Sequence, residues 1–251
     1  MNKTRLLMAS LLVCVMAVSA HAGLIVHLPL DGDLTDVAGG HTATLTDGFF
    51  GLNSYVPGTI GSALRFINPR GSETTGSSWE IDYVGIDYTL TDEGSIALWF
   101  TPEALFNYHT IFANSVNPDD WEMWVYGDGR ARARLESDSY VTKPDVVAGQ
   151  TYHIAWTWDR DDDDPTKATV NLYFDGALTE SDTGTWVDPG DTVYFGGGNG
   201  NHGANAIFDD FRIYDHALSA DEVAELAIPE PSTLALLALC GLVAVAMKRR
   251  K

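Results

Sequence analysis

Hydrophobic and polar positions alternate in short runs between residues 23 and 228. The runs are rich in Val, Ile, Thr, Tyr, Phe and Trp, and turns rich in Gly, Pro, Asn and Asp separate them. A period of two residues is typical of strands that bury one face. The pattern predicts strands at Ser95–Phe100, Trp121–Tyr126, Arg130–Leu135, Tyr152–Trp158, Ala168–Phe174 and Ala206–Tyr214, and Gly127–Gly129 is a hairpin signal between two of them.

Only one helix is predicted. Ser219 and Glu222 form a capping box, Val223 and Leu226 follow with an apolar edge, and the helix should end near Ala227. Many short strands with so little helix predict an all-β fold, a two-sheet antiparallel jelly-roll sandwich with one short C-terminal helix.

The first 22 residues have the order of a secretory signal peptide. Lys3 and Arg5 precede the apolar stretch Leu6–Val18, and Ala20 and Ala22 provide a small-x-small cleavage signal. We therefore expect cleavage before Gly23 and export of the domain at 23–228.

The C-terminus carries a second targeting segment. Pro229-Glu230-Pro231 precedes a 14-residue apolar run, Leu234–Met247, and four basic residues end the chain. A full membrane span needs about 20 apolar residues, so this run is short for a permanent anchor, although flanking residues can extend it. The basic end would stay on the cytoplasmic side.

This order resembles the PEP-CTERM sorting signal. The resemblance implies recognition by an exosortase-type membrane enzyme in a Gram-negative bacterium that makes extracellular polysaccharide. It also implies transient inner-membrane contact through the tail, followed by release to the cell surface or extracellular matrix. An ordinary C-terminal membrane anchor is the alternative.

Charge and cysteine content narrow the possible roles of the domain. Nine of the 15 basic residues and 34 of the 35 acidic residues lie in 23–228, which gives a net charge of −25. Such a domain repels nucleic acid and anionic lipid and offers oxygen ligands to hard cations. Cys14 and Cys240 both lie in targeting segments, so the domain has no internal disulfide and must be held by its core.

Seven segments carry a further resemblance: Leu28–Asp36, Gly61–Phe66, Ser95–Pro102, His153–Asp159, Leu172–Gly176, Ile207–Tyr214 and Ala217–Val223. In this order they resemble the LamG-like jelly rolls of the concanavalin A-like superfamily. The resemblance implies that the first and last strands lie side by side. It does not assign a function, because this fold carries lectins, adhesion modules and hydrolases.

A hydrolase of this superfamily would need a strand with the pattern Glu-x-Asp-x-Glu. Glu80 and Asp82 begin such a motif, but Val84 and Gly85 stand where the second glutamate should be. A retaining enzyme needs two carboxyl groups, so we predict no catalytic residues and interpret Glu80 and Asp82 as the polar face of a strand.

The resemblance also implies a structural calcium ion where the chain closes on itself. Asp31 and Asp209 are the best candidate ligands, and Asp33 and Asp210 are weaker ones because adjacent strand residues point to opposite faces. Backbone carbonyls of the glycine-containing turn could complete the shell. The alternative is that Asp31 and Asp36 simply cap turns.

Two charged segments have open interpretations. The five aspartates within Asp159–Asp164 could gather calcium or form a solvated hairpin tip. Arg130, Arg132 and Arg134 share one face of a strand and could bind an acidic sugar or pair with acidic neighbours.

These observations predict a secreted, surface-sorted, non-catalytic module that binds glycan or matrix polysaccharide. Loops of such sandwiches carry ligand contacts, and exposed aromatic side chains would stack on sugar rings. A structural matrix protein without a specific ligand, or a divergent polysaccharide hydrolase or lyase, is the alternative. All seven tryptophans have plausible core positions.

Overall fold

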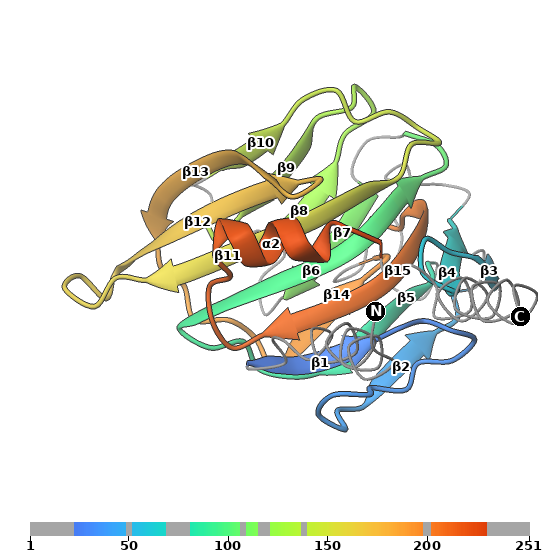
Figure 1. Ribbon diagram of the computed structural model, residues 1–251, viewed down its shortest axis with the longest axis horizontal. Helices are drawn as coiled ribbons and strands as arrows, with labels where there is room; N and C mark the ends of the chain where they lie inside the picture. The colour runs from blue at the N-terminus through green and yellow to red at the C-terminus, as the bar shows by residue number, and fades with distance from the viewer. Residues whose placement is uncertain are drawn as a thin grey trace, which may run out of the picture.

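Two antiparallel sheets enclose one hydrophobic core in the computed structural model, and a short helix lies on the outside of one sheet (Figure 1). The structure describes residues 23–48, 52–68, 81–105, 109–114, 121–136, 140–197 and 202–229. The strands are β1 (Leu24–Leu28), β2 (Ala43–Thr46), β3 (Leu52–Pro57), β4 (Ser62–Ile67), β5 (Tyr83–Asp87), β6 (Glu93–Pro102), β7 (His109–Asn114), β8 (Glu122–Val125), β9 (Ala131–Arg134), β10 (Val141–Lys143), β11 (Tyr152–Arg160), β12 (Lys167–Phe174), β13 (Ala177–Thr185), β14 (Thr192–Phe195) and β15 (Asn205–Tyr214).

The first sheet has the order β13-β12-β11-β6-β15-β4-β3, and the second has the order β10-β9-β8-β7-β14-β5-β2. Strand β15 lies beside β6 on one side. On its other side β15 pairs first with β4, through residues 205–208, and then with β1, through residues 211–214. The first and last strands are therefore neighbours, as the resemblance implied.

Alternation along the strands sorts side chains between the core and the outer faces. In β6, Ile96, Leu98 and Phe100 belong to the core, whereas Ala97 belongs to a separate cluster under the helix. All six tryptophans in the described part of the chain are buried, and Trp121 contacts Trp156, Trp158 and Trp186 edge-on. Because the domain has no disulfide, burial of these large aromatic side chains is a main source of its stability.

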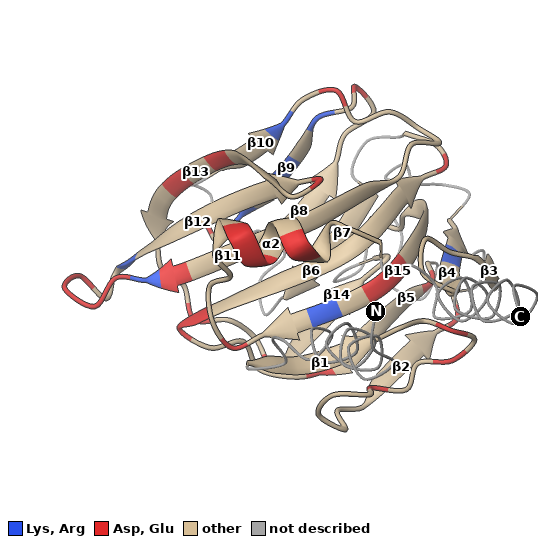
Figure 2. Ribbon diagram, in the orientation of Figure 1, with Lys and Arg blue, Asp and Glu red and all other residues tan. Residues whose placement is uncertain are grey.

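The strand predictions are confirmed, with boundaries that differ by at most two residues. Strands β8 and β9 form the hairpin predicted from Gly127–Gly129. The aspartate-rich segment is the tip between β11 and β12, which Figure 2 shows as a red loop that projects from the body of the domain.

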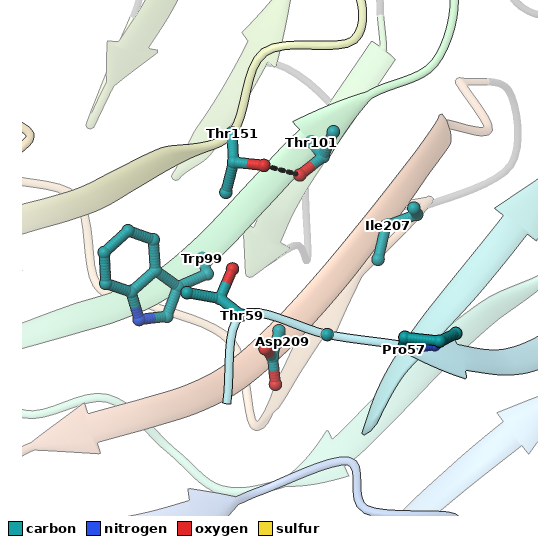
Figure 3. Close-up of a pocket in the computed structure, with 8 residues that line it drawn as sticks. Pro57, Thr59, Trp99, Thr101, Thr151, Ile207 and Asp209 are labelled. Atoms are coloured by element: carbon teal, nitrogen blue, oxygen red, sulfur yellow. Dashed lines mark hydrogen bonds between the residues drawn. The ribbon is translucent and has the colours of Figure 1, made fainter. Parts of the chain in front are cut away.

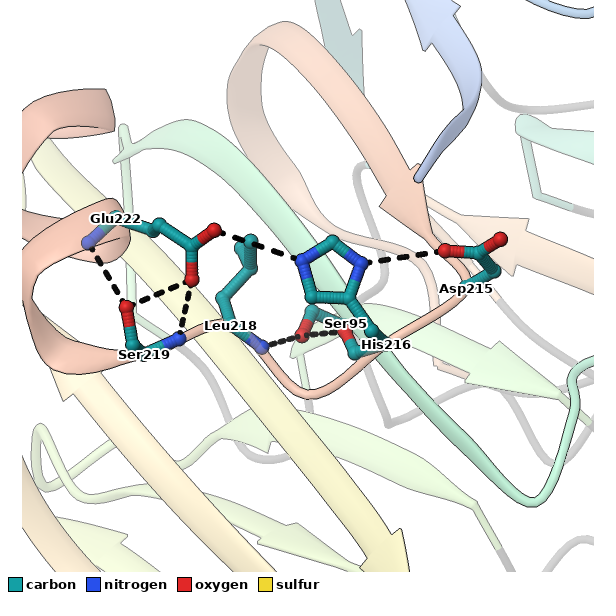
Figure 4. Close-up of polar contacts among 6 residues, drawn as sticks. All are labelled: Ser95, Asp215, His216, Leu218, Ser219 and Glu222. Carbon is teal, nitrogen blue, oxygen red and sulfur yellow. Dashed lines mark hydrogen bonds and ion pairs between the residues drawn. The ribbon is translucent and has the colours of Figure 1, made fainter. Parts of the chain in front are cut away.

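Helix α2 (Ala220–Leu226) begins as the sequence predicts. The Ser219 hydroxyl accepts a hydrogen bond from the Glu222 backbone N–H, and the Glu222 carboxylate accepts from the Ser219 N–H at 2.8 Å (Figure 4). The segment before the helix is fastened by Ser95, whose hydroxyl donates to the His216 carbonyl and accepts from the Leu218 N–H, both at 2.8 Å. Val223 then packs on the outer face of the first sheet, in a cluster with residues of β6, β11, β12 and β15.

Several sequence predictions lie outside the described residues. These are the signal peptide with its cleavage residues Ala20 and Ala22, Glu80 of the incomplete hydrolase motif, and Glu230, Pro231 and the apolar tail. Within the described ranges, no helix has both the length and the apolar character needed to cross a membrane.

Candidate functional site

A bulge in β15 brings two aspartates together at the seam between β1 and β4. The pairing of β15 with β6 shifts register between Asp209 and Arg212, and Asp210 has a φ of 52°. Phe208 and Phe211, on either side, both remain in the core. The bulge therefore breaks the alternation that would otherwise send one of the two carboxylates inward.

Asp209 is held by the turn that follows β3. Its Oδ2 accepts a hydrogen bond from the Ile60 N–H at 2.9 Å, and its Oδ1 is buried with no hydrogen-bond partner. Burial raises the pKa of Asp209 to about 6, against the backbone N–H groups of Ile60 and Thr59, and the charges of Asp210 and Asp31 add to the rise.

Asp210 has a different environment. Its carboxylate contacts His27 Nε2 of β1 at 2.6 Å and Arg212 at 2.8 Å. Burial raises the pKa of Asp210, but the hydrogen bond from His27 and the charge of Arg212 outweigh burial and hold it below its ordinary value. This carboxylate is therefore already neutralised by protein groups.

The predicted calcium ligands are partly brought together. Asp31 Oδ1 accepts from the Ser62 N–H at 2.6 Å, so Asp31 and Asp209 hold the same turn, residues 58–62. Asp33 instead accepts from the Thr35 N–H at 2.8 Å, in a local turn, and Asp210 is paired with His27 and Arg212. Asp36 accepts four backbone N–H groups, which confirms the turn-capping role considered for it.

Of the four predicted ligands, only the carboxylates of Asp31 and Asp209 are placed to bind a hard cation together. A buried carboxylate oxygen without a partner, next to a second carboxylate, is the environment that a calcium ion would neutralise. Within the described residues, no group of three or more His, Cys, Asp or Glu side chains is placed to hold a metal. Calcium bound here would need backbone carbonyls or water for the remaining ligands, and the site stays a prediction.

A pocket of about 170 Å³ opens beside Asp209 on the outer face of the first sheet (Figure 3). It is lined by Pro57, Gly58, Thr59, Trp99, Thr101, Thr151, Ile207 and Asp209. The Thr101 and Thr151 hydroxyls are 2.7 Å apart and share a hydrogen bond across its upper wall. The pocket thus combines an indole, three hydroxyl groups and a carboxylate in a space that fits one sugar ring.

Trp99 is the largest side chain of the pocket. Its position opposite His153 and Asp209 on the two neighbouring strands places it in the middle of the sheet. The indole Nε1 is buried without a hydrogen-bond partner, and the His153 ring contacts Trp99 edge-on at 5.1 Å. Burial lowers the pKa of His153 to about 4, so this histidine is a neutral support for the indole at ordinary pH.

Asp82 of the incomplete hydrolase motif is a buried structural residue. It precedes β5, and its oxygens accept from the Gly48 N–H at 2.7 Å and from Asn53 Nδ2 at 2.9 Å. The interpretation of Asp82 as part of the polar face of an alternating strand is therefore wrong, because Asp82 is buried and lies before the strand.

Arg130, which precedes β9, and Arg132 and Arg134 of β9 pair unequally with acidic residues. Arg130 contacts Asp128 at 2.8 Å and Arg134 contacts Glu122 at 3.5 Å, whereas Arg132 has no carboxylate partner within the described residues. The predicted pairing with a neighbouring strand is confirmed for Arg134, whose partner Glu122 lies in β8, whereas Arg130 pairs within the hairpin turn.

Trp99, Thr101 and Thr151 are not among the site residues predicted from the sequence. One signal was present in β6, where Ser95, Ala97, Trp99 and Thr101 alternate with Ile96, Leu98 and Phe100. A tryptophan in register with Ser, Ala and Thr belongs to the outer face of the sheet. Thr151 has no such signal, because only the sheet pairing brings it to Thr101.

The profile of the concanavalin A-like lectin/glucanases superfamily matches residues 75–224, and the PEP-CTERM protein-sorting motif matches residues 227–251. The chain belongs to the concanavalin A-like lectin/glucanase superfamily. Its C-terminal motif implies recognition by an exosortase and indicates export and sorting to the cell envelope. No curated protein matches the chain significantly.

Solved structures of this superfamily's fold resemble the chain at low sequence identity. Domain 4 of AbnA, an extracellular GH43 arabinanase from Geobacillus stearothermophilus solved in complex with arabinotriose, aligns with a TM-score of 0.64 and 21% identity, over 83% of this chain and 100% of that domain. The receptor binding domain of botulinum neurotoxin type G aligns with a TM-score of 0.59 and 19% identity, over 82% of this chain and 51% of that one. The binding domain of botulinum neurotoxin DC, in complex with SialylT, gives 0.58 and 14%, again over 82% and 51%. At these low sequence identities, the comparisons show that the chain shares the fold of these domains.

Proposed function

We propose that the domain is a non-catalytic glycan-binding module and that the Trp99 pocket holds one sugar residue. The observation that carries this proposal is the composition of the pocket: an indole wall, the hydroxyls of Thr59, Thr101 and Thr151, and the carboxylate of Asp209. Sugar rings offer an apolar face to an aromatic side chain and hydroxyl groups to polar side chains.

Two polar atoms at the pocket favour a ligand that can both donate and accept hydrogen bonds. Trp99 Nε1 and Asp209 Oδ1 are buried and have no hydrogen-bond partner, and Asp209 Oδ1 can serve a sugar hydroxyl only where no calcium ion occupies it. Such atoms cost free energy unless a ligand or water satisfies them. A sugar hydroxyl can accept from one group and donate to another, and the arabinotriose complex of the AbnA domain gives a precedent for saccharide binding on this fold.

The non-catalytic part of the proposal rests on the carboxylates. Hydrolysis with retention or inversion needs two carboxyl groups that flank the scissile bond. Asp82 is engaged by Gly48 and Asn53, and Asp210 by His27 and Arg212, which leaves Asp209 as the carboxylate that lines the pocket.

The sorting signal indicates where the module would meet its ligand, which is the cell envelope. A module exported and sorted to the envelope would meet the polysaccharide that the cell itself secretes, so we propose that extracellular matrix polysaccharide is the natural ligand. Loss of the tail after sorting would release the module at the cell surface or into the matrix.

A glycan array tests the proposal, with residues 23–228 as the probe. We expect wild type to bind a subset of glycans, and Trp99→Ala and Thr151→Val to lose the signal. Tyr194→Ala, which removes an aromatic ring from the second sheet, should keep it. Folded wild type that binds nothing on the array or on the host's own polysaccharide would favour a purely structural matrix protein. Release of reducing ends from that polysaccharide would favour a hydrolase.

A further inference from the structure

The outer face of the second sheet carries arginines interleaved with aromatic rings. Ala131 and Ala133 of β9 are fully buried, so Arg130, Arg132 and Arg134 lie on the opposite side of the strand. We call this surface the arginine–tyrosine face, which consists of Trp124, Tyr126, Arg130, Arg132, Arg134 and Tyr140.

Arg132 lies at the centre of this face. Its guanidinium carbon is 5.5 Å from the centre of the Tyr126 ring and 5.3 Å from that of Tyr140. On either side, Arg130 lies over Tyr126 at 5.2 Å and Arg134 lies over Trp124 at 4.9 Å. Contacts between cations and rings at these distances fix the guanidinium without using its N–H groups.

Arg132 differs from its two neighbours in having no ion pair with a described residue. Asp128 pairs with Arg130 and Glu122 with Arg134, but Arg132 makes no ion pair or hydrogen bond with any described residue, and its Nε is buried without a partner. In a domain with a net charge of −25, a positive charge without a carboxylate partner among the described residues is unexpected. The nearby acidic side chains of β13 are already used, because Glu180 accepts from the Thr142 N–H and Asp182 from the Tyr140 N–H.

We propose that Arg132 binds the carboxylate of an acidic saccharide, a uronate residue, whose sugar ring packs on Tyr126 or Tyr140. The guanidinium offers a planar pair of donors that matches a carboxylate, and the exposed part of the half-buried Tyr126 and Tyr140 rings offers apolar surface beside it. A neutral sugar would leave the arginine unpaired, and an acidic peptide would leave the tyrosine faces without a ring to stack on them.

This site is separate from the Trp99 pocket, because the two lie on different sheets. It refines the proposed function by adding an acidic sugar to the ligand class. The two can fail separately, since a Trp99 substitution should leave uronate binding at Arg132 unchanged and an Arg132 substitution should leave the Trp99 pocket unchanged.

Calorimetric titration of residues 23–228, which hold both sheets and the whole core, tests the proposal with trigalacturonate and with its carboxyl-reduced neutral counterpart. We expect saturable binding of the acidic trisaccharide alone, and a loss of affinity of at least about tenfold in Arg132→Gln, as expected when a charge-assisted pair is removed. Arg132→Lys should recover part of the affinity, because lysine restores the charge without the fork. The control is Arg65→Gln, which removes an arginine of the first sheet that already pairs with Glu103.

Circular dichroism shows whether each variant is folded. If Arg132→Gln does not fold, Arg132→Lys is the deciding variant, and its affinity for trigalacturonate should be several-fold lower than that of wild type. The proposal is overturned if wild type binds the neutral trisaccharide equally well, if neither trisaccharide binds, if both Arg132 variants keep wild-type affinity, or if oligoglutamate binds as tightly as the uronate.

Discussion

At the scale of single residues, the bulge of β15 determines which aspartate carboxylate keeps an oxygen that can bind a ligand. Asp210 is neutralised by His27 and Arg212, whereas Asp209 shares a turn with Asp31 and keeps one oxygen without a partner. The family resemblance implied that Asp31 and Asp209 would lie close together. It could not predict that Asp33 would cap its own turn, because that choice depends on a local backbone hydrogen bond.

The calcium proposal predicts a metal-dependent melting temperature. A ligand that binds only the native state stabilises it by RT ln(1 + [L]/Kd), about 2.7 kcal/mol at 100 times Kd. We expect millimolar calcium to raise the melting temperature of residues 23–228 relative to EDTA. Asp31→Ala and Asp209→Asn should remove the difference, and Asp33→Ala should keep it. Identical melting curves in calcium and EDTA would exclude the site.

His109 predicts a loss of stability in mild acid. The side chain is fully buried, its Nδ1 accepts a hydrogen bond from the Asn205 N–H at 3.1 Å, and burial lowers its pKa to about 4. The unfolded state, with a histidine pKa near 6.5, then binds more protons between about pH 6.5 and pH 4. The contribution of His109 to stability is therefore complete above about pH 6.5 and is lost as the pH falls toward 4.

Urea unfolding at pH 7 and pH 5 measures this effect. The free energy of unfolding should be lower at pH 5, and the difference should shrink in His109→Asn but not in the control His41→Asn. Because burial also lowers the pKa of His153 and His202, part of the difference should remain in His109→Asn. A pH dependence that is the same in His109→Asn and wild type would contradict this assignment.

At the scale of elements, helix α2 closes the outer face of the first sheet. Its seven residues are too few to be stable alone, so the capping box and the contact of Val223 with the sheet must hold it. Figure 4 shows how His216, between Asp215 at 3.2 Å and Glu222 at 3.7 Å, continues this set of contacts toward the end of β15.

Removal of the cap should therefore be measurable. Ser219→Ala is expected to lower the free energy of unfolding by about 1 kcal/mol, because one helix N–H and the Glu222 contact lose their partner. Denaturant unfolding of Ser219→Ala and of the control Asp221→Ala measures it. An equal effect of the two substitutions would show that the box itself contributes nothing beyond helix charge.

Alternation and turn signals sufficed for the long strands β6, β11, β12 and β15, for the β8–β9 hairpin and for α2. They did not give β2, β3, β7, β10, β13 or β14, which are defined by their partner strands rather than by their own pattern. The same limit applies to the site. Trp99 left a trace in the alternation of β6, but Thr59 and Thr151 reach the pocket only through pairings between distant segments.

At the scale of the whole molecule, a concanavalin A-like domain is followed along the chain by a PEP-CTERM sorting motif. We predict that the mature protein lacks both Met1–Ala22 and the apolar tail, which is lost near Pro229-Glu230-Pro231. The reason is that the 14-residue run is short for a permanent span. Intact-mass spectrometry of protein from the cell exterior measures this, and a mass that includes Leu234–Lys251 would contradict processing by sorting.

The central claim is that a sugar occupies the Trp99 pocket, and the Trp99 indole N–H reports on it directly. This N–H is buried without a partner, and the other described tryptophans do not line the pocket. Its signal in a ¹H–¹⁵N correlation spectrum, assigned by its absence in Trp99→Phe, should shift in a saturable manner as the strongest array glycan is added, while most other indole signals stay in place. A glycan that binds with measurable affinity and leaves the Trp99 signal unmoved would contradict the account.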